Sequence, residues 1–351
     1  MTYERFLAID NVCGWPNLAL LPNGEIVAVV FNQPCHGTWE GDVESWGSAD
    51  GGRSWHQRGV VAPHEPGTVR MNVGGGLVPG GDLVYVVSGW NTMKPPGQPI
   101  EGLHRDLCQV IEPWVCRSSD GGSTWSHRAG AVETPGVYGN CVIAFGKIVR
   151  GADGRLGLAM HGVAGDSRTG RKGGAYVVRS DDGGATWGDP VLIVEEHNET
   201  DLLVAPDGRW LAASRAWRGG HLDLYVSLDN GASWDHHDRV TAASQHPPHL
   251  LHLADGAVLL TYGIRHRGLY GIGARFTEDL DHWSSPMVVL NFNNPACGDG
   301  GYPSSVQLED GTVVTAYYAQ KTAEHQRYHV GVVRWDPRAW YRMNTSAYEG
   351  F

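Results

Sequence analysis

The stretch Ser180-Asp181-Asp182-Gly183-Gly184-Ala185-Thr186-Trp187 recurs along this chain, and its recurrence decides the fold. The segments 48–55, 118–125 and 227–234 carry Ser, Asp, Gly and Trp at the same offsets, and 277–283 is a copy one residue shorter. An Asp side chain can bond its own backbone, and Gly tolerates positive φ. Each copy therefore predicts a tight hairpin turn with the closing Trp packed beneath it. We call this repeated turn the Asp-box; it marks one hairpin per structural unit rather than an active site.

A second repeated turn sets the number of units. Six times a β-rich run is interrupted by two turn residues that end in Gly, and these glycines lie 48 to 73 residues apart. Asn-Gly and Asp-Gly between such runs are strong signals for a β-hairpin. That period, with about four strands per unit, is typical of a β-propeller. We therefore predict an all-β protein, a six-bladed β-propeller that forms a single domain over residues 1–351. The turns are Asn23-Gly24, Gly80-Gly81, Asp153-Gly154, Asp207-Gly208, Asp255-Gly256 and Asp310-Gly311.

The two kinds of turn also predict which face of the propeller binds a ligand. If the Gly turns join the first and second strands of a blade and the Asp-boxes join the third and fourth, both lie on one face. The opposite face, which we call the mouth, receives the start of each first strand and the loop after each second strand. Ligand sites lie where such loops converge. We expect residues 329–335 to form a strand of blade six. Residues 6–9 are expected to supply the outer edge of that blade, which closes the ring.

Composition excludes several classes of function. A net charge of −11 argues against nucleic acid as a partner, because phosphate binding needs a basic face. No stretch approaches the ~20 apolar residues of a membrane span, so no membrane partner is expected. Residues 1–6 lack a basic region followed by an apolar core, which predicts no signal peptide. The six cysteines are scattered without CxxC spacing. We therefore expect reduced thiols, a cytoplasmic location, and no metal or other cofactor.

Asp-boxes on a six-bladed propeller resemble the sialidase (neuraminidase) superfamily, and the resemblance covers nearly the whole chain. Sialidases have a Glu in an Asn-Glu context at the start of blade four and an arginine about sixteen residues later, which Asn198-Glu199 and Arg215 match. A second arginine ends the second strand of blade five, where this chain has Arg265 or Arg267. These two alternate along a strand end, so one is expected to point away from the mouth. A tyrosine starts blade six, and Tyr302 matches it.

The chain also departs from the sialidase pattern. The Arg-Ile-Pro motif that opens blade one in sialidases is replaced by Gly14-Trp15-Pro16-Asn17, so the first arginine of the carboxylate-binding triad is missing. Arg70, which opens blade two, is the candidate to replace it. The acid/base Asp of the blade-one loop has no clear counterpart, and Glu40 and Asp42 are the candidates by position. The resemblance therefore implies a divergent member of the superfamily rather than an ordinary sialidase.

The resemblance implies the chemistry of a retaining glycosidase with a tyrosine nucleophile. A sugar with a carboxylate near its anomeric carbon repels a carboxylate nucleophile, whereas a phenol deprotonated by a neighbouring Glu avoids that clash. The mouth arginines would hold the acid group of the sugar, because guanidinium groups match carboxylates bidentately. The candidate catalytic residues are Tyr302, Glu199, Glu40, Asp42 and His36, and the candidate substrate-binding residues are Arg215, Arg265, Arg267, Arg70, His161, Trp90 and His246.

Purely structural roles compete with these assignments. Tyr302 can pack in the central channel, and Glu199 can pair with Arg215 without doing chemistry. Each mouth histidine can be an ordinary hydrogen-bonding loop residue. Several histidines at one rim leave a metal site or a His base open, although no metal-ligand spacing supports zinc.

Three functions follow from these alternatives. The leading hypothesis is a sialidase-like exo-glycoside hydrolase that releases a terminal acidic or modified sugar from a glycan or oligosaccharide. The first rival is a polysaccharide lyase, in which an arginine neutralises a uronate and His36, His161 or a tyrosine removes the C5 proton. The second rival is a non-catalytic carbohydrate-binding propeller. All three predict a carbohydrate partner, and the enzyme hypothesis predicts that the side chains of Tyr302, Glu199 and Arg215 converge on one cavity at the mouth.

Overall fold

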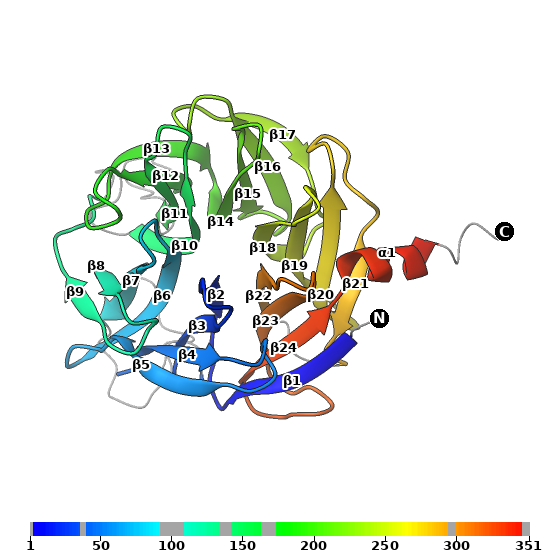
Figure 1. Cartoon of the computed structure of the whole chain (residues 1–351), viewed down its shortest axis with the longest axis horizontal. Coiled ribbons are helices and arrows are strands. Elements are labelled where there is room, and N and C mark those ends of the chain that lie inside the picture. The colour runs from blue at the N-terminus through cyan, green and yellow to red at the C-terminus, as the bar shows by residue number, and fades with distance from the viewer. Residues whose placement is uncertain are drawn as a thin grey trace.

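Six four-stranded antiparallel sheets are arranged as blades around a central axis (Figure 1). The structure is a computed structural model that describes residues 3–35, 40–91, 109–133, 142–162, 173–293 and 299–345. The predicted six-bladed all-β propeller is confirmed. Blades one to three comprise β2 (Asn17–Leu20), β3 (Ile26–Phe31), β4 (Val43–Ser48) and β5 (His56–Ala62); β6 (Thr68–Leu77), β7 (Leu83–Asn91), β8 (Gln109–Ser118) and β9 (Ser126–Arg128); and β10 (Val142–Arg150), β11 (Leu156–Gly162), β12 (Gly174–Ser180) and β13 (Gly188–Glu195).

The other three blades complete the ring, and in all six the first strand lies nearest the axis (Figure 1). In blade six the fourth strand is the first strand of the chain. Blades four to six comprise β14 (His197–Val204), β15 (Trp210–Ala216), β16 (Leu222–Ser227) and β17 (Asp235–Arg239); β18 (Gln245–His252), β19 (Val258–His266), β20 (Leu269–Thr277) and β21 (Met287–Asn291); and β22 (Gly301–Gln307), β23 (Val313–Ala319), β24 (His329–Trp335) and β1 (Tyr3–Asp10).

Blade six brings the two ends of the described chain together. β1 pairs antiparallel with β24, from Tyr3 opposite Trp335 to Asp10 opposite His329, so residues 6–9 lie at the outer edge expected for them. The helix α1 (Pro337–Thr345) follows β24 and is nine residues long. Among the described residues, no helix is long and apolar enough to cross a membrane.

The Gly turns join the first and second strands of every blade, as predicted, but each connection is longer than two residues. In blade one the Gly24 N–H donates to the Leu21 carbonyl over 2.9 Å, and the Leu21 N–H donates to the Glu25 carbonyl over 2.8 Å. Gly24 has a φ of +84°, in the left-handed region that favours glycine. The same two bonds recur in all six turns. Each connection is therefore a three-residue loop closed by a glycine bulge, and the sequence predicted its position but not its type.

The Asp-boxes join the third and fourth strands of blades one to five, and in blades one to four they do so through one repeated set of hydrogen bonds. In the second box, Asp120 Oδ1 accepts the N–H groups of Ser123 and Thr124 over 3.0 and 2.9 Å, and the Thr124 hydroxyl donates to Oδ2 over 2.5 Å. These bonds, that from the Thr124 hydroxyl above all, lower the pKa of Asp120 to about 2. Trp125 Nε1 donates to the Gly122 carbonyl over 3.0 Å, which confirms the predicted position of the Trp beneath the turn.

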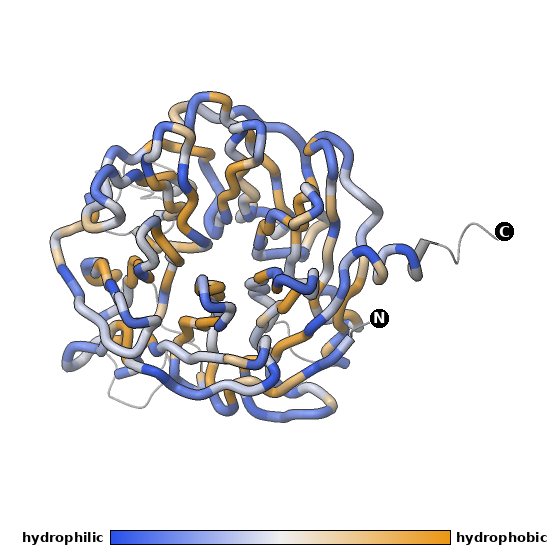
Figure 2. The backbone as a smooth tube through the Cα atoms, viewed as in Figure 1, coloured by the Kyte–Doolittle hydropathy of each residue, from blue (hydrophilic) through white to orange (hydrophobic). Residues whose placement is uncertain are grey.

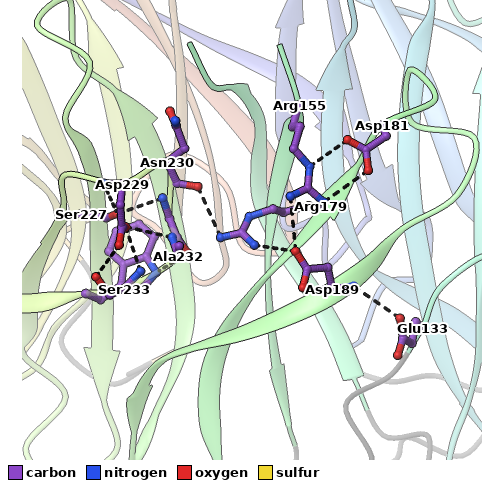
Figure 3. A network of polar contacts seen from close by, with 12 residues as sticks. Glu133, Arg155, Arg179, Asp181, Asp189, Ser227, Asp229, Asn230, Ala232 and Ser233 are labelled. Carbon is purple, nitrogen blue, oxygen red and sulfur yellow. Dashed lines mark hydrogen bonds and ion pairs between the residues drawn. The ribbon is translucent and has the colours of Figure 1, made fainter. Parts of the chain in front are cut away.

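Arginine side chains connect the Asp-boxes to the preceding blades, which the sequence analysis did not predict. Arg179 on β12 reaches the Asn230 carbonyl, in the Asp-box of blade four, over 3.4 Å and pairs with Asp189 over 2.6 Å (Figure 3). A charged donor on a backbone carbonyl of the next blade resists separation of the two blades. We call the five contacts of this kind the inter-blade arginine bonds. The others run from Arg58 to Gly121, Arg117 to Gly183, Arg209 to Asp279 and Arg334 to Gly51.

The apolar core lies largely between neighbouring blades. Figure 2 shows hydrophobic residues concentrated along the strands and hydrophilic residues at the outer turns. At one such interface, Ile26 and Val30 of blade one pack against Val314 and Val332 of blade six, and all four are fully buried. Each buried side chain of this size contributes about 1.5–3 kcal/mol, so the interfaces between blades, rather than the single sheets, hold the ring together.

Polar side chains cross-link the first strands around the axis. Lys147 Nζ on β10 pairs with Asp201 on β14 over 2.5 Å, and Asp201 accepts the N–H of Leu250 on β18 over 2.6 Å. Asn17 on β2 donates from Nδ2 to the Gly146 carbonyl of β10 over 2.8 Å. A buried ion pair is tolerated only where further hydrogen bonds offset its desolvation, as they do at Asp201. We call these contacts the axial polar belt.

Candidate active site

Four of the six first strands carry a β-bulge at their mouth end, and three of these bulges hold candidate site residues. In β14, Asn198-Glu199 stand opposite the single residue Arg215, because His197 pairs with Ala216 and Thr200 with Ser214. Equivalent register shifts enclose His246 in β18 and Tyr302 in β22, and a fourth encloses Met71 in β6. Bulges re-aim side chains and are common beside active sites. In each of these strands the bulge therefore breaks the regular alternation of side chains at the site residue.

The structure brings Tyr302, Glu199 and Arg215 together, so their predicted convergence is confirmed. The Tyr302 hydroxyl donates to Glu199 Oε1, and Arg215 Nη1 donates to Glu199 Oε2 over 2.5 Å. Tyr302 has a φ of +51°, a left-handed conformation that costs a residue with a Cβ about 1–3 kcal/mol. Glu199 and Arg215 keep 12% and 24% of their side-chain surface exposed, so solvent reaches both.

The charges of this trio are well defined near neutral pH. Burial acts to raise the pKa of Glu199, but the Arg215 charge and the Tyr302 hydrogen bond lower it to about 2. Burial, followed by the Glu199 charge, raises the pKa of Tyr302 well above its usual range. Burial acts to lower the pKa of Arg215, but the Glu199 charge outweighs burial and raises this pKa above its ordinary value. The trio is therefore a neutral phenol, a carboxylate and a guanidinium.

Arg265, on β19, extends the site over the Tyr302 ring. Its Cζ lies 5.4 Å from the ring centroid, and Nη2 donates to the Gly300 carbonyl over 3.0 Å. The Nε of Arg265 is buried without a hydrogen-bond partner in the described part of the chain. Such an unmade bond is costly, and a bound anion can complete it. Arg267 is exposed in the turn after β19, so Arg265 is the arginine that belongs to the cluster.

Two histidines lie within the electrostatic reach of the trio. Burial above all lowers the pKa of His161 to about 4, and it also feels the charges of Glu199 and Arg215. Burial, together with the charges of Arg215 and Arg265, lowers the pKa of His246 to about 3. The Nδ1 atom of each ring has no hydrogen-bond partner among the described residues. Both imidazoles are therefore neutral polar groups beside the arginines.

Aromatic side chains surround the Tyr302 ring. Trp15 meets it edge-on at a centroid distance of 6.3 Å, and Phe145 does so at 6.1 Å. Trp90 packs in the same cluster and donates from Nε1 to Asn72 Oδ1 over 2.9 Å. Trp15 thus stands beside the candidate nucleophile in the segment where sialidases carry their first arginine.

Asp299 and Tyr318 are part of this cluster but were not among the predicted site residues. Asp299 accepts the hydroxyls of Tyr318 and Tyr328 over 2.5 and 2.6 Å. The Tyr318 ring lies 5.5 Å from that of Tyr302. Their positions at the start and end of blade-six strands, at the predicted mouth, were the available signal. No motif distinguished them from other mouth residues.

The placement of Arg70 contradicts its suggested role as a substitute mouth arginine. Its guanidinium donates to the Glu112 carbonyl over 2.7 Å, pairs with Glu65 over 2.7 Å, and lies 3.8 Å from the Trp114 ring centroid. The neighbours of Arg70 in β6, Val69 and Met71, pack in the cluster that contains Tyr302. Because successive side chains of a strand point to opposite faces, Arg70 points away from that cluster.

The blade-one loop candidates do not contact the trio. Asp42 is held by His64, whose backbone N–H and Nδ1 lie 2.7 and 2.8 Å from Asp42 Oδ1. Glu40 makes one long contact, accepting the Gly67 N–H over 3.4 Å. His36 lies outside the described residues. Within the described ranges, no group of three or more His, Cys, Asp or Glu side chains is arranged to hold a metal ion.

Comparison with known proteins identifies the family. A family model for the BNR repeat-like domain matches residues 101–315, and the chain belongs to this family. A sialidase from Micromonospora viridifaciens is 27% identical over 259 residues, which cover 66% of this chain and 38% of the sialidase. The chain thus spans well under half the length of that relative.

Solved structures agree on the fold. A protein of unknown function from Dyadobacter fermentans superposes with a TM-score of 0.78 at 24% identity, covering 94% of this chain and 97% of that one. A Hadza microbial sialidase superposes with a TM-score of 0.68 at 17% identity, covering 93% of this chain and 66% of that one. The chain is therefore a divergent BNR-repeat member of the sialidase superfamily with the sialidase propeller fold.

Proposed function

We propose that this protein is a sialidase-like exo-glycoside hydrolase that releases a terminal acidic or modified sugar from a glycan or oligosaccharide. One observation carries the proposal: a tyrosine hydroxyl from blade six meets a carboxylate and a guanidinium from blade four by direct hydrogen bonds. The strained backbone at Tyr302 supports a functional rather than a packing role, because such strain is concentrated at active sites.

In the first chemical step, the Tyr302 oxygen attacks the anomeric carbon while its proton passes to Glu199. The proton stays on the phenol in the resting protein, because the pKa of Tyr302 is raised and that of Glu199 is lowered to about 2. Transfer becomes favourable as the phenol oxygen bonds to the carbon and the aglycone departs. The result is a glycosyl–tyrosine bond and a protonated Glu199. In the second step water attacks the same carbon, its proton leaves to the acid/base residue, and Glu199 returns its proton to Tyr302.

The departing aglycone oxygen needs a proton from a residue at the mouth. Glu40 is the stronger of the two loop candidates, because Asp42 is held at short range by His64, whereas the Glu40 carboxylate accepts one bond, of 3.4 Å, from the described residues. An activated aryl leaving group needs little protonation, but a sugar leaving group needs it fully. Glu40→Gln should therefore slow natural linkages far more than nitrophenyl glycosides.

Arg265 supports an anionic group on the substrate. Its buried Nε lacks a partner in the described structure, and its charge lies over the nucleophile's ring. A carboxylate there would complete the guanidinium hydrogen bonds, each worth about 1.5–3 kcal/mol. Arg265 and Arg215 would then hold the acid group, while His161 and His246 offer neutral donors to the hydroxyl or acyl groups beside it.

A screen of aryl glycosides tests this proposal. Nitrophenyl glycosides of sialic acid, uronic acids and deoxysugars are incubated with the wild-type protein and with Tyr302→Phe and Glu199→Gln. We expect release of nitrophenol from an acidic or modified sugar by the wild type only, with retained anomeric configuration in the first product seen by NMR. Binding of the sugar without turnover, unchanged in both variants, would instead assign the protein as a carbohydrate-binding propeller.

A polysaccharide lyase remains the second candidate because of the two neutral imidazoles beside Arg215. A neutral His161 can accept a C5 proton while an arginine neutralises the uronate, although its pKa of about 4 makes it a weak base. A lyase forms a 4,5-unsaturated sugar that absorbs in the ultraviolet, and a hydrolase does not. Incubation with uronate-containing polysaccharides and absorbance measurement therefore separates the two.

A further inference from the structure

His197, two residues before Glu199 on β14, is held by contacts at both nitrogens of its ring. Its Nδ1 lies 2.9 Å from the Glu195 carbonyl and its Nε2 lies 3.0 Å from Asp223 Oδ2. A carbonyl oxygen only accepts, so Nδ1 donates to it. Burial acts to raise the pKa of Asp223, but the hydrogen bond with His197 and the charges of the neighbouring histidines lower it, so Nε2 faces a carboxylate.

The surroundings of this ring hold it in place. His197 and Asp223 are 8% and 9% exposed, so the pair is largely shielded from water. His221, just before β16, lies with Nε2 3.2 Å from the same Asp223 oxygen, and His236 on β17 lies 3.7 Å from the other. Tyr225 on β16 meets His197 edge-on at 5.8 Å.

The ring anchors one end of the bulge that carries Glu199. The backbone of His197 pairs with Ala216 on the mouth side of the bulge. On the other side, the Thr200 hydroxyl donates to the Asn198 carbonyl over 2.7 Å and bonds Ser214. The clamp on the His197 side chain therefore reinforces the end of the two-residue bulge that Thr200 does not reach.

We propose that His197 is a positioning residue for Glu199, held between the Glu195 carbonyl and Asp223. Loss of the imidazole removes both contacts and loosens the mouth end of the bulge. Glu199 then moves relative to Tyr302 and Arg215. A displacement of about 1 Å at a catalytic group can slow a reaction about 10²-fold. The effect on turnover rests on the proposed hydrolase function, whereas the effect on the position of Glu199 does not.

The positioning role is tested with the aryl glycoside that the wild type cleaves. His197→Gln should lower kcat about 10²-fold with KM nearly unchanged. His236→Gln is the matched control, because its side chain is 54% exposed and lies farthest from Asp223. An unchanged kcat in His197→Gln would overturn the proposal.

A second readout keeps the two proposals separable. The Tyr302 hydroxyl proton, hydrogen-bonded to Glu199, should give a downfield proton resonance that is absent in Tyr302→Phe. We expect His197→Gln to shift this resonance and His236→Gln to leave it in place. If no glycoside is cleaved but the resonance behaves in this way, the hydrolase proposal fails and the positioning of Glu199 stands. An unshifted resonance in His197→Gln would contradict the positioning role itself.

Discussion

The Asp-box face and the mouth of this propeller both depend on carboxylates, but the two faces use them in opposite ways. At the Asp-box face, the carboxylate oxygens of Asp120 accept hydrogen bonds from backbone N–H groups and hydroxyls within five residues of it. At the mouth, Glu199 bonds Tyr302, 103 positions away, and Arg215, 16 positions away. The first arrangement is repeated from blade to blade, and the second occurs once. Repetition in this molecule therefore marks architecture, and the exceptions to it mark chemistry.

The largest predicted effect separates chemistry from architecture directly. Tyr302→Phe keeps the ring that packs against Trp15 but removes the hydroxyl that donates a hydrogen bond to Glu199. We expect turnover of the aryl glycoside to fall by about 10³-fold or more, with little change in urea stability. Asp182→Asn, in the Asp-box of blade three, is the control, and it should retain turnover. Near-normal rates in Tyr302→Phe would show that the phenol is not the nucleophile.

The next effect contrasts a buried with an exposed carboxylate. Asp201→Ala leaves the Lys147 ammonium unpaired in the axial polar belt, and we expect a loss of about 3–5 kcal/mol in the free energy of unfolding. Asp189→Ala removes an ion pair at the Asp-box face whose Asp side chain is 57% exposed, and we expect a loss of at most about 1 kcal/mol. Urea denaturation measures both. Equal losses would mean that the axial polar belt contributes no more to the free energy of unfolding than an exposed ion pair does.

Acid should weaken the axis and the mouth before it weakens the Asp-boxes. Burial lowers the pKa of His161 to about 4 and those of His246 and His249 to about 3. Below pH 6.5, the ordinary pKa of histidine, these side chains bind protons in the unfolded chain but not in the folded one. The free energy of unfolding therefore falls as pH drops from about 6.5 towards 4. Each histidine contributes at most about 1.4 kcal/mol per pH unit. Urea unfolding at several pH values tests this, and His249→Gln should reduce the slope.

The Asp-box carboxylates respond only at lower pH. With the pKa of Asp120 lowered to about 2, the unfolded chain takes up the proton first, near pH 4, and the stabilisation is lost as pH falls towards 2. A stability profile that is flat between pH 6.5 and 4.5 would contradict the contribution of the three histidines. It would leave that of the Asp-boxes untouched.

The smallest predicted effect concerns the inter-blade arginine bonds. Arg179→Met keeps the apolar stem but removes the bonds to the Asn230 carbonyl and Asp189 (Figure 3). We expect a loss of about 1–2 kcal/mol in the free energy of unfolding and no change in turnover. Arg128→Met, at an exposed position on β9, should change stability by no more than about 0.5 kcal/mol. Identical stabilities of the two variants would remove these bonds as a stabilising device.

The sequence predicted the features whose partners lie close by in the chain. An Asp-box or a Gly turn contains all the atoms that it bonds, so its residues identify it without reference to the rest of the fold. The number of blades and the mouth followed from these turns, whereas the convergence of Tyr302, Glu199 and Arg215 followed from the resemblance to sialidases. Contacts between blades that neither a turn nor the resemblance marks were missed, as Arg179 and Asn230 illustrate.

Strand register explains the principal error. A strand shifted by one residue presents the opposite set of side chains, so the direction of Arg70 depends on where β6 begins and on its bulge. Val69 and Met71 face the aromatic cluster and Arg70 faces Trp114, which no pattern in the sequence distinguishes. Asp299 was missed for a related reason, because its partners Tyr318 and Tyr328 come from strands that meet only in the folded blade.

The pairing of β1 with β24 has a consequence for biosynthesis. Glu4 and Arg334, which bond across this pair, are 330 positions apart. A ribosome therefore releases the Tyr3–Asp10 segment long before its partner exists, and the nascent chain carries an unsatisfied edge throughout translation. Because the entropy of joining distant segments grows only logarithmically with separation, the long wait adds little thermodynamic penalty. Blade six can therefore close only after β24 has been synthesised, which makes the joining of the two chain ends a late step.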